Sequence, residues 1–303
     1  MKTISTIIPS IRGGKSLIRS IDSALNQIIQ TEKVIVVLSG VKNSNHLTLL
    51  DRYKDNNKID FIFFDEKISA TNARNIGFSK TNSDLVHFLD DDDYILKDFY
   101  KDTLDLWSSE KIVGVSHSVK WISENNLVNT FSTRSKKNIT KLDLLKDNYV
   151  GVTSSVVLLS DIFSKVGGFT DEMPARQDYD LWIKMSQYGI FKTTPTPNLC
   201  WTHHLDQESV SNTRNLDNHL NAIKMIDKRK SSISKVYKKR YIKHISNSNH
   251  YLYLARRAKN INYFLFLKFI TMSFFNYPNL KALSELLPNW IFFKLRLLKH
   301  KLK

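Results

Sequence analysis

Apolar residues in the first third of the chain follow two alternating patterns, one typical of buried strands and the other of amphipathic helices. Four short runs are rich in apolar β-branched or aromatic residues, and the second has no polar alternation after Lys33, as a strand covered on both faces does. They are residues 3–9, 33–38, 59–64 and 84–89. Helical spacing of apolar residues separates them, at 16–28, 47–53 and 72–79. The alternation predicts an α/β fold, a doubly wound, mostly parallel sheet with helices on both faces.

The middle of the chain is less regular. Strands are expected at residues 112–118 and 152–159, and residues 127–131 should pair near the first of these. A short helix over 161–166 should end at Gly167-Gly168, because glycine adopts the left-handed conformation that ends many helices. Another helix is expected over 178–188.

Charge is distributed unevenly and divides the chain. The formal net charge is +16, yet residues 228–303 hold 18 Lys and Arg against a single acid, Glu285. The rest of the chain is nearly neutral, with 27 basic and 28 acidic residues. We therefore predict two domains, a body over residues 1–215 and a basic helical region over residues 216–303.

The basic region contains three helical segments of different character. Residues 224–257 are basic, residues 260–276 are very apolar but carry Lys268, and residues 290–299 form a basic amphipathic segment. A charge in the centre and a length of only 17 residues argue against a membrane span. These segments are therefore predicted to lie on an anionic membrane surface.

Composition favours a folded protein of a reducing compartment. Hydrophobic residues make up 42% of the chain, which is ample for a core, and Cys200 is the single cysteine. One cysteine allows no intramolecular disulfide, and the N-terminus lacks a signal-peptide pattern. We expect a cytoplasmic protein, peripheral on the inner face of the cell membrane.

The most informative stretch is an apolar run, Val86–Leu89, that stops at four carboxylates, Asp90–Asp93. Four adjacent carboxylates repel one another unless a cation lies among them. Oxygen ligands at the end of a strand suit Mg²⁺ or Mn²⁺, with substrate phosphates completing the coordination. The alternative interpretation is a solvated acidic turn in which Asp93 caps a helix starting near Ile95.

The order of several short motifs resembles the inverting family 2 glycosyltransferases of the GT-A fold, over residues 1–215. These motifs are Pro9-Ser10, Asn72-Ala73-Arg74-Asn75, Phe88 to Asp93, Gly167-Gly168-Phe169, and Gln177 to Trp182. The resemblance implies a GT-A catalytic domain that transfers a sugar from a nucleoside-diphosphate donor. The bacterial enzymes of this kind build polysaccharides and cell-surface glycans.

On the donor side, the resemblance implies that Asp90 approaches the ribose and Asp92 binds the cation, Mn²⁺ or Mg²⁺, on the diphosphate. Such a metal neutralises charge on the leaving group. Arg74 is expected to reach the pyrophosphate through its planar fork. The other donor-binding residues implied are Pro9, Ser10, Arg12, Asn72, Asp91 and Ser154.

On the acceptor side, Asp178 matches the general base of the family. It would take the proton of the acceptor hydroxyl, and the helix N-terminus would help to keep it ionised. Asp180 competes for this role. The glutamate that precedes the base in the family is Gln177 here.

Three further positions carry weaker signals. In the polar loop after the base helix, one of His203 and His204 is implied as a metal or phosphate ligand, and His203 is preferred. The family often has an aspartate after the second strand, but this chain reads Val37-Leu38-Ser39-Gly40, and Arg12 stands where a small polar residue is common. The nucleotide is therefore open between uridine and thymidine, with a UDP-sugar favoured.

The sequence thus predicts a metal-dependent hexosyl- or N-acetylhexosaminyltransferase acting on a hydroxyl of a glycan or lipid-linked glycan. One alternative is a sugar nucleotidyltransferase, which Arg12-Gly13-Gly14-Lys15 faintly suggests but which leaves Asp178 without a role. Another is a non-enzymatic binder of membranes or nucleic acid, driven by the basic region. Because its basic residues alternate with Phe, Leu, Ile and Trp, a lipid surface is favoured and no nucleic acid is expected. The oligomeric state stays open.

Overall fold

The computed structural model describes most of the chain. The described residues are 2–11, 13–40, 49, 51–107, 111–123, 128–132, 136–203, 215–259, 261–278, 282 and 285–286, with the side chains of 123, 128–132 and 203 outside the description. The chain divides into two compact units. Unit 1 comprises residues 1–144, 148–173 and 177–207, and unit 2 comprises residues 145–147, 174–176 and 208–303.

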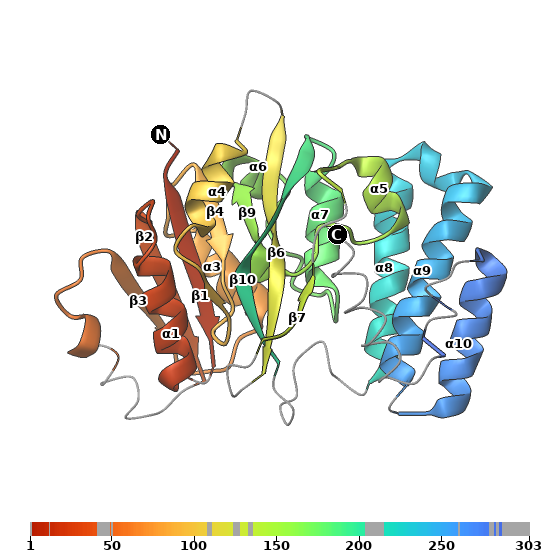
Figure 1. Ribbon diagram of the computed structural model, residues 1–303, viewed down its shortest axis with the longest axis horizontal. Helices are drawn as coiled ribbons and strands as arrows, with labels where there is room; N and C mark the ends of the chain where they lie inside the picture. The colour runs from red at the N-terminus through yellow and green to blue at the C-terminus, as the bar shows by residue number, and fades with distance from the viewer. Residues whose placement is uncertain are drawn as a thin grey trace. The chain divides into compact units, whose positions relative to one another are not determined.

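Unit 1 is built on one mixed sheet (Figure 1). Its strands are β1 (Ile4–Ser10), β2 (Lys33–Ser39), β3 (Ile59–Phe64), β4 (Leu85–Phe88), β5 (Tyr94–Ile95), β6 (Ile112–Ser123), β7 (Val128–Ser132), β8 (Asn138–Ile139), β9 (Val156–Leu159) and β10 (Ile190–His203). The strand order is β3-β2-β1-β4-β9-β6-β10-β5, with β7 paired to β6 and β8 to β10.

The first four strands of that order are parallel to one another. The order reverses between β1 and β4, because β2 and β3 extend to one side of β1 while β4 lies on the other. Beyond β4 the sheet becomes mixed: β9 is antiparallel to both β4 and β6, and β6 is parallel to β10. In open α/β sheets, ligands bind at the carboxyl ends of strands next to such a reversal.

Helices cover the sheet of unit 1. They are α1 (Gly14–Leu25), α3 (Ala70–Phe78), α4 (Phe99–Asp105), α5 (Lys141–Lys146), α6 (Ser160–Lys165) and α7 (Gln177–Met185), with a 3₁₀ turn η1 (Thr153–Ser155). Apolar residues of α1 share a core cluster with Ile8 and Val36, whereas Gly77 of α3 abuts Ile7 and Val37. Neighbouring strand residues point to opposite faces, so α1 and α3 lie on opposite faces of the sheet.

Most of the predicted elements of unit 1 are confirmed, with shifted boundaries. The expected strand over 152–159 is wrong in its first half, because residues 153–155 form a 3₁₀ turn before β9. Of the expected helix over 47–53, the described residues 49 and 51–53 are helical. The long strand β10 was not predicted.

Unit 2 is helical. Its elements are α8 (Leu216–Ile233), η3 (Lys235–Lys238), α9 (Arg240–Ala258) and α10 (Tyr263–Asn276). The predicted helical segment over 224–257 is confirmed as helical and comprises the end of α8, η3 and most of α9. A core of apolar residues from α9 and α10, including Leu254, Ala255 and Phe266, holds the unit together. The predicted segment 290–299 lies outside the described residues. In the described part of the chain, no helix is both long and apolar enough to span a bilayer.

Candidate active site

Two predicted donor-binding residues meet where the strand order reverses. Ser10 ends β1, and Asp91 follows the neighbouring parallel strand β4. The Ser10 hydroxyl donates a hydrogen bond of 2.6 Å to Oδ2 of Asp91. Asp91 is only 5% exposed, so this contact ties the end of β1 to the aspartate turn.

Arg74 joins the same group from α3. Ser69 caps this helix by accepting a hydrogen bond from the backbone N–H of Asn72 at 3.1 Å. The guanidinium of Arg74 pairs with Oδ1 of Asp90 and lies 5.4 Å from the ring centre of Phe169. Arg74 is 8% exposed, so its charge is buried beside the carboxylate that balances it.

Asn75 explains why two distant motifs occur together. Its side chain accepts a hydrogen bond from the Phe169 N–H at 2.9 Å and donates one to the Phe169 carbonyl at 3.0 Å. Gly168 has φ of 61°, and a Cβ there would lie 2.5 Å from Oδ1 of Asn75. The positive φ and the close approach of Asn75 therefore both require glycine at position 168. The hydrogen bonds between Asn75 and Phe169 place Phe169 beneath Arg74.

Ser154 reaches the aspartate turn from η1. Its hydroxyl accepts a hydrogen bond of 3.1 Å from the Asp90 N–H, and its carbonyl lies 2.8 Å from Nε2 of His87. Burial lowers the pKa of His87 to about 4, so its imidazole is neutral and donates through Nε2. Ser154 is fully buried, and sequence reasoning missed the role of His87 in fixing it.

Asp93 is buried beneath the turn rather than capping a helix. Its Oδ1 accepts a hydrogen bond from the Thr202 N–H at 3.1 Å, while Oδ2 has no hydrogen-bond partner in the described part of the chain. Burial, followed by the charges of Asp92 and Asp90, raises its pKa well above the usual value. The capping interpretation is wrong, because Tyr94–Ile95 form β5 and the next helix begins at Phe99.

Arg19 of α1 was missed by the sequence analysis. Its guanidinium donates to the Asp92 carbonyl at 2.7 Å and to the Thr202 hydroxyl at 3.0 Å, and it stacks over the Tyr94 ring at 4.6 Å. The hydroxyl of Ser20 donates to the Asp93 carbonyl. Both residues fix the backbone of the aspartate turn. The available signal was limited to Ser20, a polar residue at the helical spacing of the apolar residues Leu17, Ile21 and Ala24.

The predicted base, Asp178, lies in the first turn of α7 and is partly exposed. Its Oδ1 accepts a hydrogen bond from the Tyr179 N–H at 2.7 Å, and its Oδ2 accepts one from the Asn148 amide at 3.2 Å. Asp180, the competitor, has no exposed surface, and the Thr170 hydroxyl donates to it at 2.7 Å. Its burial favours a structural role for Asp180.

One chain segment, residues 148–154, connects the candidate base Asp178 with the aspartate turn Asp90–Asp93. Asn148 begins this segment, and its side chain donates a hydrogen bond to Asp178. The same side chain accepts a hydrogen bond from the Gly151 N–H at 3.0 Å and donates one to the Gly151 carbonyl at 3.4 Å. Trp182 of α7 donates to the Gly151 carbonyl at 3.0 Å. Three residues further on, Ser154 contacts Asp90. The segment thus runs from the candidate base to the aspartate turn.

The aspartate turn offers carboxylate oxygens that could hold a divalent cation. Among the described residues, no group of three or more His, Cys, Asp or Glu side chains is arranged to hold a metal. Mg²⁺ is commonly held by one or two carboxylates together with water and substrate phosphates. Asp90 and Asp92 supply such oxygens, and Oδ2 of Asp93, which has no hydrogen-bond partner among the described residues, is a further oxygen at the turn. The residues fit a cation shared with a bound diphosphate.

The remaining predicted residues are less informative. Pro9 lies in β1 and pairs with Val37 of β2, and Asn72 lies in the first turn of α3. His203 ends β10, but its side chain is outside the description, as are Arg12 and His204. Their assigned roles stay predictions.

Comparison with known proteins identifies the family. The family model for glycosyl transferase family 2 matches residues 5–166, which is more than half of the chain. The chain belongs to this family. The match favours the enzymatic interpretation over a non-enzymatic binder.

Curated relatives agree with this assignment. An uncharacterised glycosyltransferase of Rickettsia conorii is 28% identical over 205 residues, covering 63% of this chain and 32% of the relative. Chondroitin synthase of Escherichia coli is 22% identical over 213 residues, covering 69% of this chain and 30% of that protein. The chain thus spans about a third of the length of these relatives.

Solved structures confirm the fold class. The crystal structure of residues 1–349 of Staphylococcus aureus TarS superposes with a TM-score of 0.67 at 14% identity, covering 91% of this chain and 81% of that one. The same protein in complex with UDP-GlcNAc gives a TM-score of 0.68. The likeness shows a GT-A type α/β fold followed by a helical C-terminal region.

Proposed function

We propose that unit 1 binds a nucleoside-diphosphate sugar at the carboxyl ends of β1 and β4 and transfers the sugar, with inversion, to a hydroxyl of a glycan or lipid-linked glycan. The observation that carries this proposal is the convergence of Ser10, Arg74 and Ser154 on the Asp90–Asp93 turn. A UDP-sugar is favoured, since a protein of this fold has been crystallised with UDP-GlcNAc.

The donor side needs positive charge to accept a diphosphate. Arg74 supplies a buried guanidinium whose partner, Asp90, is 36% exposed in its side chain. Its fork matches phosphate oxygens, and a change of partner from carboxylate to phosphate costs little reorganisation. Mn²⁺ or Mg²⁺ held by Asp92 would stabilise the negative charge that develops on the leaving diphosphate. His203 is proposed as its further ligand on the family pattern alone.

The acceptor side needs a base. Asp178 would take the proton of the attacking hydroxyl, because a neutral alcohol is a weak nucleophile until its proton is removed in the transition state. The Asn148 amide orients one carboxylate oxygen, and the first-turn position favours the ionised form. The sugar, hexosyl or N-acetylhexosaminyl, depends on pocket shape.

Product analysis separates this function from nucleotidyl transfer. We expect incubation with a panel of UDP- and dTDP-sugars plus Mn²⁺ to release a nucleoside diphosphate, slowly with water and faster with an acceptor. A sugar nucleotidyltransferase would instead form or consume pyrophosphate. Release of pyrophosphate without nucleoside diphosphate would overturn the proposal.

The partner proposed for unit 2 is an anionic membrane surface. One stripe of α10 carries Phe264, Lys268, Thr271 and Phe275, which lie within about 60° of one another at 100° per residue. Phe264 and Phe275 are 83% and 80% exposed. Residues 228–303, which include this helix, hold one acid, Glu285. Exposed aromatic rings beside lysine in such a basic segment are typical of helices that lie in the headgroup layer.

Replacing both rings should weaken membrane binding. Burying a phenylalanine side chain contributes about 1.5–3 kcal/mol. Phe264→Ser/Phe275→Ser should therefore lower partitioning onto phosphatidylglycerol liposomes by at least about thirtyfold. Co-sedimentation measures this. Ile28→Ser removes an apolar side chain that is 56% exposed in unit 1 and serves as the control. Equal binding by the parent and the double variant would exclude α10 as the contact.

A further inference from the structure

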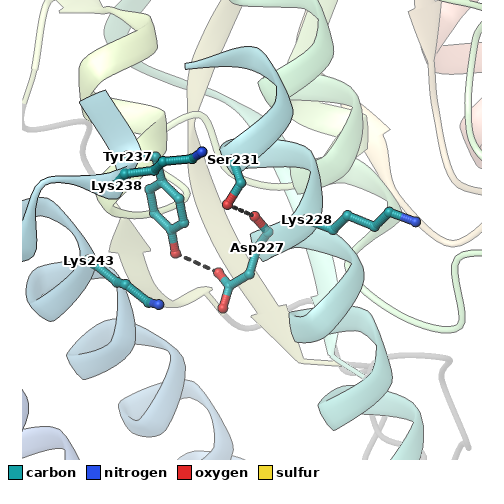
Figure 2. Close-up of a pocket in the computed structure, with 6 residues that line it drawn as sticks. All are labelled: Asp227, Lys228, Ser231, Tyr237, Lys238 and Lys243. Carbon is teal, nitrogen blue, oxygen red and sulfur yellow. Dashed lines mark hydrogen bonds between the residues drawn. The ribbon is translucent and has the colours of Figure 1, made fainter. Parts of the chain in front are cut away.

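Unit 2 contains a pocket of its own, formed where α8, η3 and α9 meet. Its volume is about 280 Å³, and Figure 2 shows the residues that line it: Asp227, Lys228, Ser231, Tyr237, Lys238 and Lys243. Pockets for drug-sized ligands are roughly 300–1,000 Å³. This pocket is therefore large enough for a small charged group and a part of the molecule that carries this group, but too small for a whole nucleotide.

Three ammonium groups line the pocket together with one carboxylate, that of Asp227. Lys228, Lys238 and Lys243 are exposed, and their side chains make no hydrogen bond or ion pair within the described part of the chain. Glu285, the single acid after Asp227, already pairs with Arg256 at 2.8 Å. The protein itself therefore offers these three lysines little neutralising charge.

The carboxylate of Asp227, the acid of the pocket, is held by buried side chains of unit 2. The Tyr237 hydroxyl donates to its Oδ1 at 2.7 Å, and Nε2 of His250 lies 3.1 Å from the same oxygen. Burial alone would raise the pKa of Asp227, but the His250 and Tyr237 hydrogen bonds and the Lys230 charge outweigh it, so the pKa is lowered. Asp227 is thus a structural anion, charged and held in place by the unit's own groups.

A buried layer supports this arrangement. The Arg176 guanidinium donates to Nδ1 of His250 at 3.0 Å, which leaves the other ring nitrogen to donate to Asp227. Burial lowers the pKa of His250 to about 4, so the ring is neutral. Burial also lowers the pKa of Lys230 to about 7, against the opposing charges of Asp227 and Asp147. In this layer Arg176 therefore carries the fixed positive charge, while His250 is neutral and Lys230 is only partly protonated near pH 7.

The two hydroxyl groups of the pocket further limit the chemical class of ligand that the pocket can bind. Ser231 donates to the Asp227 carbonyl at 2.8 Å, and Tyr237 donates to the Asp227 carboxylate (Figure 2). Both hydroxyl protons are used, so the donors left for a ligand are ammonium groups, and in Figure 2 the Lys228 side chain points away from those of Lys238 and Lys243. Lysine binds phosphate as a compact point charge with rotatable donors. A group composed of acceptor oxygens with negative charge satisfies such a pocket.

We propose that this pocket binds a phosphate group, and that in the reaction proposed above it holds a phosphate-bearing acceptor on unit 2. The phosphate belongs either to a lipid headgroup or to a soluble phosphorylated glycan, since both present the same oxygens. The role in acceptor binding rests on the proposed transferase function. The binding itself does not, and it is measured without a donor sugar.

The test compares two double variants of the full chain that remove the same charge. Lys238→Gln/Lys243→Gln alters the pocket, whereas Lys235→Gln/Lys239→Gln alters exposed lysines of the same segment that do not line it. Calorimetry with inorganic phosphate and glycerol 1-phosphate gives the dissociation constants. We expect the pocket variant to bind at least about tenfold more weakly and the control to stay within about threefold of the parent. Binding by the parent should weaken as salt rises.

Two results would overturn the proposal: equal losses in both variants, which indicate a diffuse positive surface, or a parent that binds neither probe. Phosphatidylcholine vesicles with and without phosphatidic acid identify the source of the phosphate. A pocket variant that loses vesicle binding relative to the control assigns a lipid phosphate. Unchanged vesicle binding with weakened glycerol 1-phosphate binding assigns a soluble one. Failure of the parent to release a nucleoside diphosphate would contradict the transferase proposal. It would not affect the phosphate- and vesicle-binding measurements, which need no donor sugar.

Discussion

Asp178→Asn is expected to lower turnover by about a hundredfold to ten-thousandfold, the range that general-base catalysis contributes. The substitution keeps the shape and the hydrogen bond with Asn148 but removes the group that takes the proton. Because the base acts on the acceptor, the dissociation constant of the donor should stay within about threefold of the parent value. Steady-state kinetics and donor titration measure the two quantities.

The matched control is Asp171→Asn, which removes an exposed carboxylate seven residues before the base. It should retain parental turnover. If donor affinity falls with Asp178→Asn as far as turnover does, Asp178 is a donor or metal ligand. The base would then be another group.

Asp92→Asn is expected to lower turnover by at least about a hundredfold, the scale of one electrostatic contact with a transition state. The change removes one charge from the aspartate turn, while the Asp92 carbonyl keeps its hydrogen bonds from Arg19 and Thr202. The backbone of the turn should therefore persist, and circular dichroism and the melting temperature should stay near those of the parent.

Asp98→Asn is the control for this change, because Asp98 is exposed and makes no side-chain cap on α4. It should not alter turnover. EDTA should reproduce the Asp92→Asn effect in the parent protein. Full activity in excess EDTA would remove the cation from the mechanism.

The parallel core of the fold was predictable because its signals are local. A strand buried on both faces is apolar throughout, as in β2, and a helix covering it repeats its apolar residues at a fixed spacing, as in α1. These patterns depend little on distant contacts. The strand order and the antiparallel placement of β9 were not encoded in any one segment.

The strand β10 was missed for an identifiable physical reason. It contains Pro195 and Pro197, which have no N–H for a ladder and normally argue against an inner strand. The structure accommodates them by a register shift against β6 between Thr194 and Leu199. Only pairing with a distant strand makes this sequence extended.

In the candidate site, the residues that stand in motifs were easier to predict than the residues that hold them. Asp90, Arg74 and Ser154 lie in recognisable patterns, and the structure brings them together. Arg19 and His87 act through the Asp92 carbonyl and the Ser154 carbonyl, so no spacing in the sequence marks them. Supporting contacts of this kind depend on the fold.

The central claim, a diphosphate site completed by a cation at the aspartate turn, is tested most directly by titrating UDP into the parent protein with Mn²⁺ and with EDTA. We expect at least about tenfold tighter binding with Mn²⁺, equivalent to about 1.4 kcal/mol, and loss of that difference in Asp92→Asn. Equal affinity for UDP in Mn²⁺ and in EDTA, or an undiminished effect of Mn²⁺ in Asp92→Asn, would contradict it.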